Sequence, residues 1–151
     1  MNDNNETKKV PEQLKPNPDL ITLNPLLGTW ELSGDSSGLV KYELMEGGFF
    51  LIQHFDIVVF GKCVKGVEVI GHPKAFGAEP DNEIRSRAYD SLGNTLDYVY
   101  EIADNTLFIW AGEKNSPAYF KGTFSESGDI NEGEWIYPDG GYKSIMKRIK
   151  N

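Results

Sequence analysis

Residues 95–111 decide the fold, and they read Thr-Leu-Asp-Tyr-Val-Tyr-Glu-Ile-Ala-Asp-Asn-Thr-Leu-Phe-Ile-Trp-Ala. Two short runs of apolar and aromatic residues flank the dipeptide Asp104-Asn105, whose residue types favour tight turns. In an extended chain, one face of the first run carries Leu96, Tyr98, Tyr100 and Ile102. This two-residue period, interrupted by a turn, predicts an antiparallel β-hairpin.

The same alternation of short strands and turn-forming residues extends over the rest of the chain. No convincing long stretch has the 3.6-residue period of a helix. The expected strands cover residues 27–33, 39–46, 49–59, 62–72, 84–92, 95–103, 106–113, 118–126, 130–137 and 141–150. Because most connections are short, consecutive strands should pair antiparallel. Ten such strands predict an all-β, antiparallel up-and-down barrel rather than a sandwich, since closure removes exposed sheet edges.

Composition and charge restrict the classes of protein that fit. The 151 residues suffice for one domain, and 39% of them are hydrophobic, enough to build a core. Acidic residues outnumber basic ones by 23 to 15, so we expect no nucleic-acid partner. The single cysteine, Cys63, excludes an internal disulfide. Without an apolar run of about 20 residues or an apolar signal segment, we expect no membrane contact and a cytoplasmic location.

The chain divides into a polar, proline-containing leader over residues 1–24 and a barrel domain over residues 25–151. Residues 1–16 cannot bury enough apolar surface to offset the entropy of ordering them, so we predict that they are disordered. Residues 18–23 begin with Pro-Asp, which suits the first turn of a helix. We expect one helical turn here, plugging one end of the barrel.

Both ends of the barrel domain carry motifs of a known superfamily. The segment Leu27-Gly28-Thr29-Trp30 resembles the Gly-X-Trp opening strand of the calycins, which include lipocalins and fatty-acid-binding proteins. The ending Met146-Lys147-Arg148-Ile149 resembles their closing strand, where a basic residue packs on that tryptophan. The resemblance implies that Trp30 and Arg148 close the barrel, by a guanidinium–indole contact that is favourable in itself. With about five residues between the first two strands, the two-helix lid of fatty-acid-binding proteins is absent.

Further motifs extend the resemblance over nearly all of residues 16–150. They include Glu-Gly-Gly-Phe-Phe-Leu-Ile-Gln at 46–53, Phe-Lys-Gly-Thr-Phe-Ser at 120–125 and Gly-Glu-Trp at 133–135. Together they are similar to an uncharacterised bacterial family of lipocalin-like β-barrel proteins, a domain of unknown function. The similarity implies a calycin-like fold but no particular reaction. Residues 72–83 form a longer link than is usual in that family, and His72 replaces a common tyrosine.

A ten-stranded barrel encloses a ligand space if it is round, whereas a flattened barrel is filled by side chains. We expect Gln53 and Glu68 to meet on adjacent strands, where a buried carboxylate needs a partner. The partner candidates are Arg85, Arg87, Tyr98 and Tyr142. The aromatic walls are expected from Tyr98, Tyr100, Trp110 and Trp135. The alternative reading of these polar residues is a purely structural hydrogen-bond network.

Metal and cofactor binding find little support in the sequence. The two histidines, His54 and His72, show no spacing typical of a zinc site. The nitrobindins, lidless ten-stranded barrels with a similar Gly-Thr-Trp start, bind haem through a histidine late in the chain. Here no histidine follows His72. We therefore expect no metal, no haem and no other cofactor.

The leading hypothesis is a non-enzymatic protein that binds a small hydrophobic or aromatic molecule inside the barrel. One alternative is a small barrel enzyme, a lyase or isomerase, that uses a Tyr/Glu/Arg cluster. A second alternative is a filled barrel without ligand. The fold alone does not decide between them, and the oligomeric state, including a homodimer, stays open.

Overall fold

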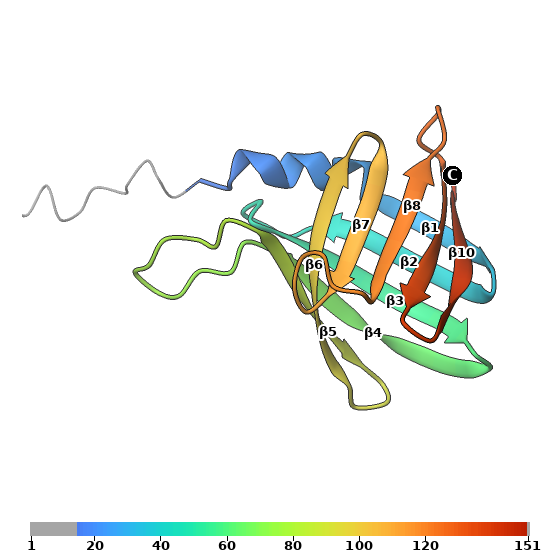
Figure 1. The fold of residues 1–151 in the computed structure, drawn as a ribbon. Helices are drawn as coiled ribbons and strands as arrows, with labels where there is room; N and C mark the ends of the chain where they lie inside the picture. The colour runs from blue at the N-terminus through green and yellow to red at the C-terminus, as the bar shows by residue number, and fades with distance from the viewer. Residues whose placement is uncertain (1–14, 151) are drawn as a thin grey trace, which may run out of the picture.

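The computed structural model describes residues 15–150, and it contains one short helix followed by ten strands (Figure 1). The helix is a 3₁₀ helix, η1 (Pro18–Leu26). The strands are β1 (Gly28–Gly34), β2 (Ser36–Leu44), β3 (Phe50–Val59), β4 (Lys62–Gly71), β5 (Ile84–Asp90), β6 (Thr95–Ala103), β7 (Thr106–Ala111), β8 (Tyr119–Phe124), β9 (Ile130–Tyr137) and β10 (Gly140–Arg148). The disorder predicted for residues 1–16 falls almost wholly outside the described residues.

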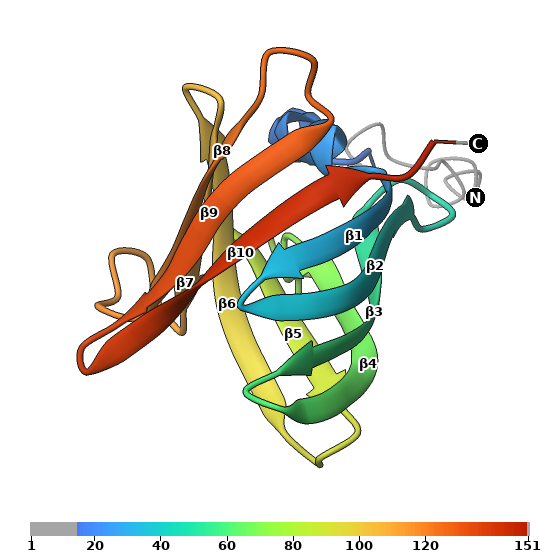
Figure 2. The same cartoon turned by 90° about the vertical axis from the view of Figure 1, so that its right-hand side faces the viewer.

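The ten strands form one closed antiparallel barrel (Figures 1 and 2). Each strand pairs with its neighbour in the chain, and β1 pairs with β10, which places Trp30 opposite Arg148. The predicted up-and-down barrel is confirmed, and every expected strand is present. Within the described residues, no helix has the length and apolarity that crossing a membrane requires.

The connection between β1 and β2 differs from the prediction. We expected about five linking residues, but only Asp35 separates the two strands. Ser36 and Ser37 belong to β2 because they pair with Val59 and Val58 of β3, beyond the point where pairing with β1 stops. Serines are typical of turns, so local sequence could not reveal that β3 extends far enough to hold them in the sheet.

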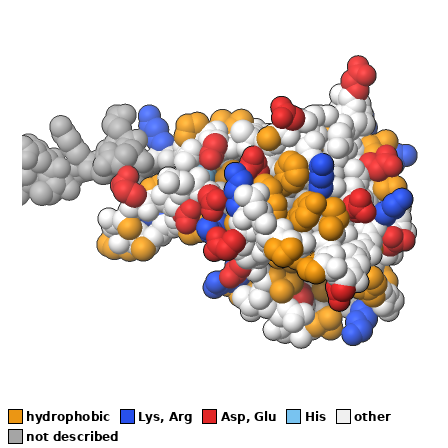
Figure 3. Space-filling model, in the orientation of Figure 1, with side chains coloured by type: hydrophobic (Ala, Val, Ile, Leu, Met, Phe, Trp, Pro, Cys, Tyr) orange, Lys and Arg blue, Asp and Glu red, His pale blue; other side chains and the backbone are white. Residues whose placement is uncertain are grey.

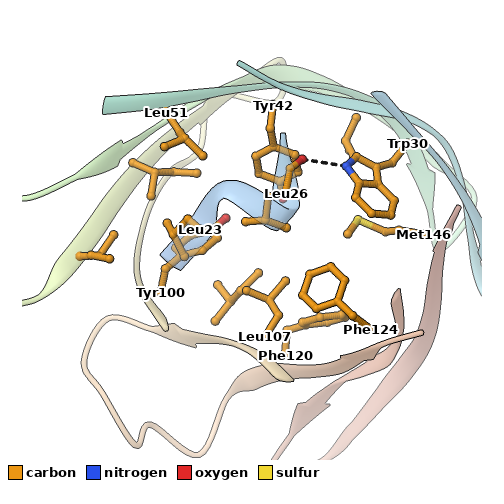
Figure 4. Close-up of a cluster of buried hydrophobic side chains, with 14 of the residues drawn as sticks. Leu23, Leu26, Trp30, Tyr42, Leu51, Tyr100, Leu107, Phe120, Phe124 and Met146 are labelled. Carbon is orange, nitrogen blue, oxygen red and sulfur yellow. Dashed lines mark hydrogen bonds between the residues drawn. The ribbon is translucent and has the colours of Figure 1, made fainter. Parts of the chain in front are cut away.

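The η1 helix plugs one end of the barrel. The predicted turn at residues 18–23 is confirmed and continues to Leu26. The Asn17 side chain caps the start of the helix by accepting a hydrogen bond from the Asp19 amide at 3.1 Å. Leu23 and Leu26 are completely buried, and Figure 4 shows them pointing into the ring of strands. This apolar contact holds the plug in place.

The seam between β1 and β10 is held by Trp30 and Arg148, as predicted. The guanidinium carbon of Arg148 lies 4.2 Å from the centroid of the Trp30 ring. Gly28 has a φ of +116°, and a Cβ atom there would lie 2.8 Å from Nη1 of Arg148. The glycine of the Gly-X-Trp motif therefore supplies both an unusual backbone conformation and the space for the guanidinium.

The same two side chains connect the seam to the plug. Arg148 donates hydrogen bonds to the carbonyl of Pro25 at 2.8 Å and to that of Leu27. The Trp30 indole donates to the carbonyl of Leu26 at 2.8 Å, a bond drawn in Figure 4. These bonds satisfy carbonyls at the end of η1 that have no partner within the helix. Arg148 also bonds the carboxylate of Asp129 at 3.1 Å.

The 72–83 link lies at the plugged end, so it does not cover the opposite end. His72 is buried, and its Nε2 lies 2.5 Å from Oδ1 of Asp19 in η1. Its Nδ1 lies 2.8 Å from the carbonyl oxygen of Asp81 within the link. His72 thus ties the plug to the link.

We expect Arg148→Met to destabilise the protein by about 2–4 kcal/mol, because several carbonyls and the Asp129 carboxylate lose their donor together with the cation–π contact. The free energy of unfolding from urea denaturation measures the effect. Lys147→Met is the matched control, since it removes an exposed charge from the neighbouring position of the same strand. Equal stabilities of the two variants would contradict a central role for Arg148.

Candidate functional site

The barrel encloses a cavity of about 230 Å³ to which all ten strands contribute side chains. It begins beneath the layer of side chains that packs on η1. It reaches the opposite end of the barrel at Leu96, which lines it and is 42% exposed. Most of the lining is apolar. The polar members are Ser36, Tyr42, Gln53, Glu68, Asp90, Tyr98, Tyr100, Tyr142 and Ser144.

A buried carboxylate is the centre of the polar lining. Glu68 of β4 is only 4% exposed. Its Oε2 accepts hydrogen bonds from the Ser86 hydroxyl at 2.5 Å and from the Tyr100 hydroxyl at 2.9 Å. In the β3–β4 register Glu68 stands opposite Gln53, whose side-chain amide donates to the Tyr42 hydroxyl at 2.5 Å. Five consecutive strands, β2 to β6, thus position this patch of polar groups.

The environment shifts the acid–base properties of this patch. Burial raises the pKa of Glu68 to about 7, although the hydrogen bonds from Ser86 and Tyr100 favour the carboxylate and act in the opposite direction. Burial, reinforced by the Glu68 charge, also raises the pKa of Tyr42 and of Tyr100. Both phenols therefore stay protonated at neutral pH and remain hydrogen-bond donors.

An aromatic wall stands beside the polar patch. The Trp135 ring centroid lies 5.5 Å from that of Phe120 and 5.9 Å from that of Tyr98, both in tilted geometry. At the open end, Phe60 in the β3–β4 turn packs edge-on against Tyr142 of β10 at 5.1 Å. Phe60 is 71% exposed. The cavity therefore offers ring faces along its side and an aromatic contact at its mouth.

The structure brings most of the predicted site residues to the cavity. Those that line it are Gln53, Glu68, Tyr98, Tyr100, Trp135 and Tyr142. The predicted meeting of Gln53 and Glu68 is confirmed by the strand register. Their part in binding a ligand stays a prediction.

The prediction that Arg85 or Arg87 partners Glu68 was wrong. Both arginines lie on the outer face of β5, and neither lines the cavity. Arg85 forms ion pairs with three acidic groups, the closest being Glu83 at 2.8 Å, and Arg87 pairs with Asp97 at 2.7 Å. Ser86, which lies between the two arginines, and Ala88, which follows Arg87, take inward positions of this strand, since alternate side chains point to opposite faces.

Trp110 also lies outside the cavity, contrary to the prediction. It stacks on Phe108 on the outer face of β7, with ring centroids 5.2 Å apart, and the Lys114 ammonium lies 5.8 Å from its ring. Figure 3 shows apolar side chains interspersed with charged ones on one side of the barrel. An outward tryptophan is buried here by its neighbours on the barrel surface.

Sequence reasoning missed two members of the polar patch. Ser86 donates one of the two hydrogen bonds to Glu68. Because side chains alternate along a strand, the sequence predicts an inward Ser86 only if Arg85 and Arg87 are assigned to the outer face. Tyr42 lies opposite Gln53 in the β2–β3 register, a pairing that depends on the length of the connection between those strands. Predicting either residue therefore requires the pairing register of its strand, and the pattern of residues alone does not determine that register.

Neither histidine reaches the cavity. His54 is exposed on β3, with Nε2 2.7 Å from a carboxylate oxygen of Glu43, and His72 is occupied at the plug. Cys63 is exposed. In the described part of the chain, no group of three or more His, Cys, Asp or Glu side chains is arranged to hold a metal ion.

The fold and the cavity define a closed antiparallel β-barrel with an interior space and one buried acidic group. No protein-family model matches the chain, and no curated protein matches it significantly. The resemblance to the lipocalin-like family therefore stays a prediction, and the geometry carries the functional inference.

We expect Glu68→Gln to change how stability depends on pH. The folded-state pKa of Glu68, about 7, lies above its ordinary value of 4.5, so the folded protein binds more protons between these values. Glu68 therefore favours folding at low pH, and this contribution is lost as the pH rises through 7, a difference of the order of 3 kcal/mol. The measurement is the unfolding free energy of wild type minus that of Glu68→Gln, from urea denaturation between pH 4.5 and 8.

Glu132→Gln, at an exposed position of β9, controls for the general loss of one negative charge. A constant difference between wild type and Glu68→Gln over the whole range would contradict the assignment.

Proposed function

We propose that this protein binds one small, mainly apolar or aromatic molecule inside the barrel and does not convert it chemically. The observation that carries the proposal is the apolar cavity with a single buried cluster of polar groups. Ligand sites in proteins typically combine apolar walls with a few placed polar groups that orient the ligand.

The size of the cavity limits the ligand. An apolar cavity of about 150 Å³ is large enough for benzene, whereas this one measures about 230 Å³. A molecule with one or two rings and a short polar substituent fits such a space. The polar substituent would contact Glu68, Tyr100 or Gln53, and its ring would lie against Tyr98 and Trp135.

The remaining assignments rest on the sequence. The Gly-X-Trp start and the motifs at 46–53 and 133–135 support membership of the lipocalin-like bacterial family. The acidic composition, with one cysteine, supports a cytoplasmic protein without a nucleic-acid partner. The oligomeric state, monomer or homodimer, is left to measurement.

Acid–base catalysis is the second candidate function, favoured by one observation. A carboxyl group with a pKa of about 7, such as that of Glu68, is suited to both accept and donate a proton at neutral pH. The predicted Tyr/Glu/Arg cluster is reduced to tyrosines and a glutamate, since the arginines lie outside. A lyase or isomerase of this kind would lose its turnover in Glu68→Gln, measured with any substrate found to react.

We expect 2-phenylethanol, a neutral molecule with one ring and one hydroxyl, to bind saturably with one site per chain in calorimetric titration. Ala88→Phe should weaken its affinity by at least about tenfold, because the added ring occupies the cavity. Ala88 lines the cavity and is the register partner of Glu68 on the adjacent strand. Tyr89→Phe, on the outer face of the same strand, is the matched control.

Tryptophan fluorescence locates the binding. Trp135 lines the cavity and Trp110 does not, so a ligand-induced change should disappear in Trp135→Phe and persist in Trp110→Phe. Absence of binding to the wild-type protein, or equal affinity of wild type and a folded Ala88→Phe variant, would rule out the cavity as the site.

A further inference from the structure

We infer that the ligand of this cavity carries a protonated amine, and that its ammonium group pairs with the carboxylate of Glu68. The inference rests on the proposed function, because it names the chemical class of the molecule bound at that site. Four observations support it.

The first observation is the charge of the lining. Among the described residues that line the cavity there are two acids, Glu68 and Asp90, and no Lys, Arg or His. A carboxylate or phosphate ligand would lose its hydration, meet two like charges and find no cation. A cationic ligand meets attraction from both acids, and the attraction is strongest at Glu68, which is buried among mainly apolar side chains. The charge of the site therefore selects against fatty acids and other anions.

The second observation is the missing partner of Glu68. Buried carboxylates are normally paired with a cation, since an unpaired buried charge is strongly unfavourable. Here both protein donors, the hydroxyls of Ser86 and Tyr100, bond the same oxygen, Oε2. The other oxygen, Oε1, takes neither of these bonds. A ligand ammonium at Oε1 would supply the opposite charge that none of the described residues provides.

The third observation is the orientation of the neighbouring groups. Hydrogen bonds from Ser86 and Tyr100 stabilise the ionised form of Glu68, which is the form that an ammonium binds. Gln53 uses its amide nitrogen to bond Tyr42, so its carbonyl oxygen is left as an acceptor. An ammonium has three N–H donors and requires several acceptors.

The fourth observation is the aromatic wall. Tyr98 and Trp135 line the same cavity as Glu68, and the faces of such rings attract cations. Asp90 is not the specific partner, because both of its carboxylate oxygens already accept hydrogen bonds in the β5–β6 turn. Its Oδ1 accepts from the backbone amides of Leu92 and Asn94, and its Oδ2 accepts from the Asn94 side chain. Its charge adds to the negative potential near the open end.

Three molecules of similar shape test the inference by calorimetry: 2-phenylethylamine, 2-phenylethanol and phenylacetate. At pH 8 we expect the amine to bind at least about tenfold more tightly than the alcohol, and phenylacetate to bind most weakly. The advantage of the amine over the alcohol should shrink towards pH 5.5, because Glu68 then binds a proton while the amine keeps its charge. Near pH 7 amine binding should release protons, seen as a dependence of the binding heat on the buffer.

Glu68→Gln should reduce the amine-to-alcohol ratio of affinities to within about twofold, since Gln keeps the shape and loses the charge. Glu132→Gln, at the exposed position on β9, should keep the wild-type ratio. If Glu68→Gln does not fold, the pH dependence of the ratio and the proton release by wild type decide the question alone.

The outcomes separate the two proposals. If 2-phenylethanol binds in the cavity and the amine binds no more tightly, the ammonium inference is overturned and the proposed binding function stands. If none of the three molecules binds and the fluorescence of Trp135 does not change, both are overturned. A wild-type preference for the amine that persists in folded Glu68→Gln would assign the cation to another group and also reject the inference.

Discussion

The contact of the Arg148 guanidinium with the Trp30 ring is the interaction on which the arrangement of this protein depends. It lies where the first and last strands meet, so it joins parts of the chain that are most distant in sequence. The same guanidinium bonds carbonyls at the end of η1, and the Trp30 indole bonds another. The same two side chains therefore close the sheet and attach the plug. Gly28 is needed beside them because its φ of +116° is a backbone conformation that other residues rarely adopt.

Because η1 plugs one end of the barrel, the cavity is accessible only from the opposite end among the described residues. Leu23 and Leu26 fill the end of the barrel near Trp30, which leaves the cavity towards the opposite end. The cavity holds a carboxylate, Glu68, that no described cation neutralises. Such a group costs stability, and a well-packed apolar residue would be the more stable choice at this position. The proposed ammonium ligand would offset this cost.

Much of the site could be predicted from the alternation of residues, and the errors concern which side chains point into the barrel. Gln53, Glu68, Tyr98 and Trp135 were assigned to the interior because their strands are apolar on one face. Residues 84–90 carry polar side chains on both faces, so the pattern did not decide whether Arg85 or Ser86 points inward. Arg85 and Arg87 were two of four partner candidates for the buried acid, beside Tyr98 and Tyr142. Among the described residues the hydroxyls of Ser86 and Tyr100 take that role. Trp110 was placed inside because of its hydrophobicity, but neighbouring side chains on the outer surface bury it equally well.

The sequence by itself determined the number, order and antiparallel pairing of the strands and the plug, and its resemblance to the calycins implied the closing pair of Trp30 and Arg148. These follow from local rules: two-residue alternation, turn chemistry, and a short motif at each end of the barrel domain. Only the tertiary structure decided which face of β5 is interior, where the cavity lies, and that Glu68 has no cationic neighbour among residues 15–150. Those properties depend on strand register and on side chains brought together from five strands, and no window of local sequence contains that information.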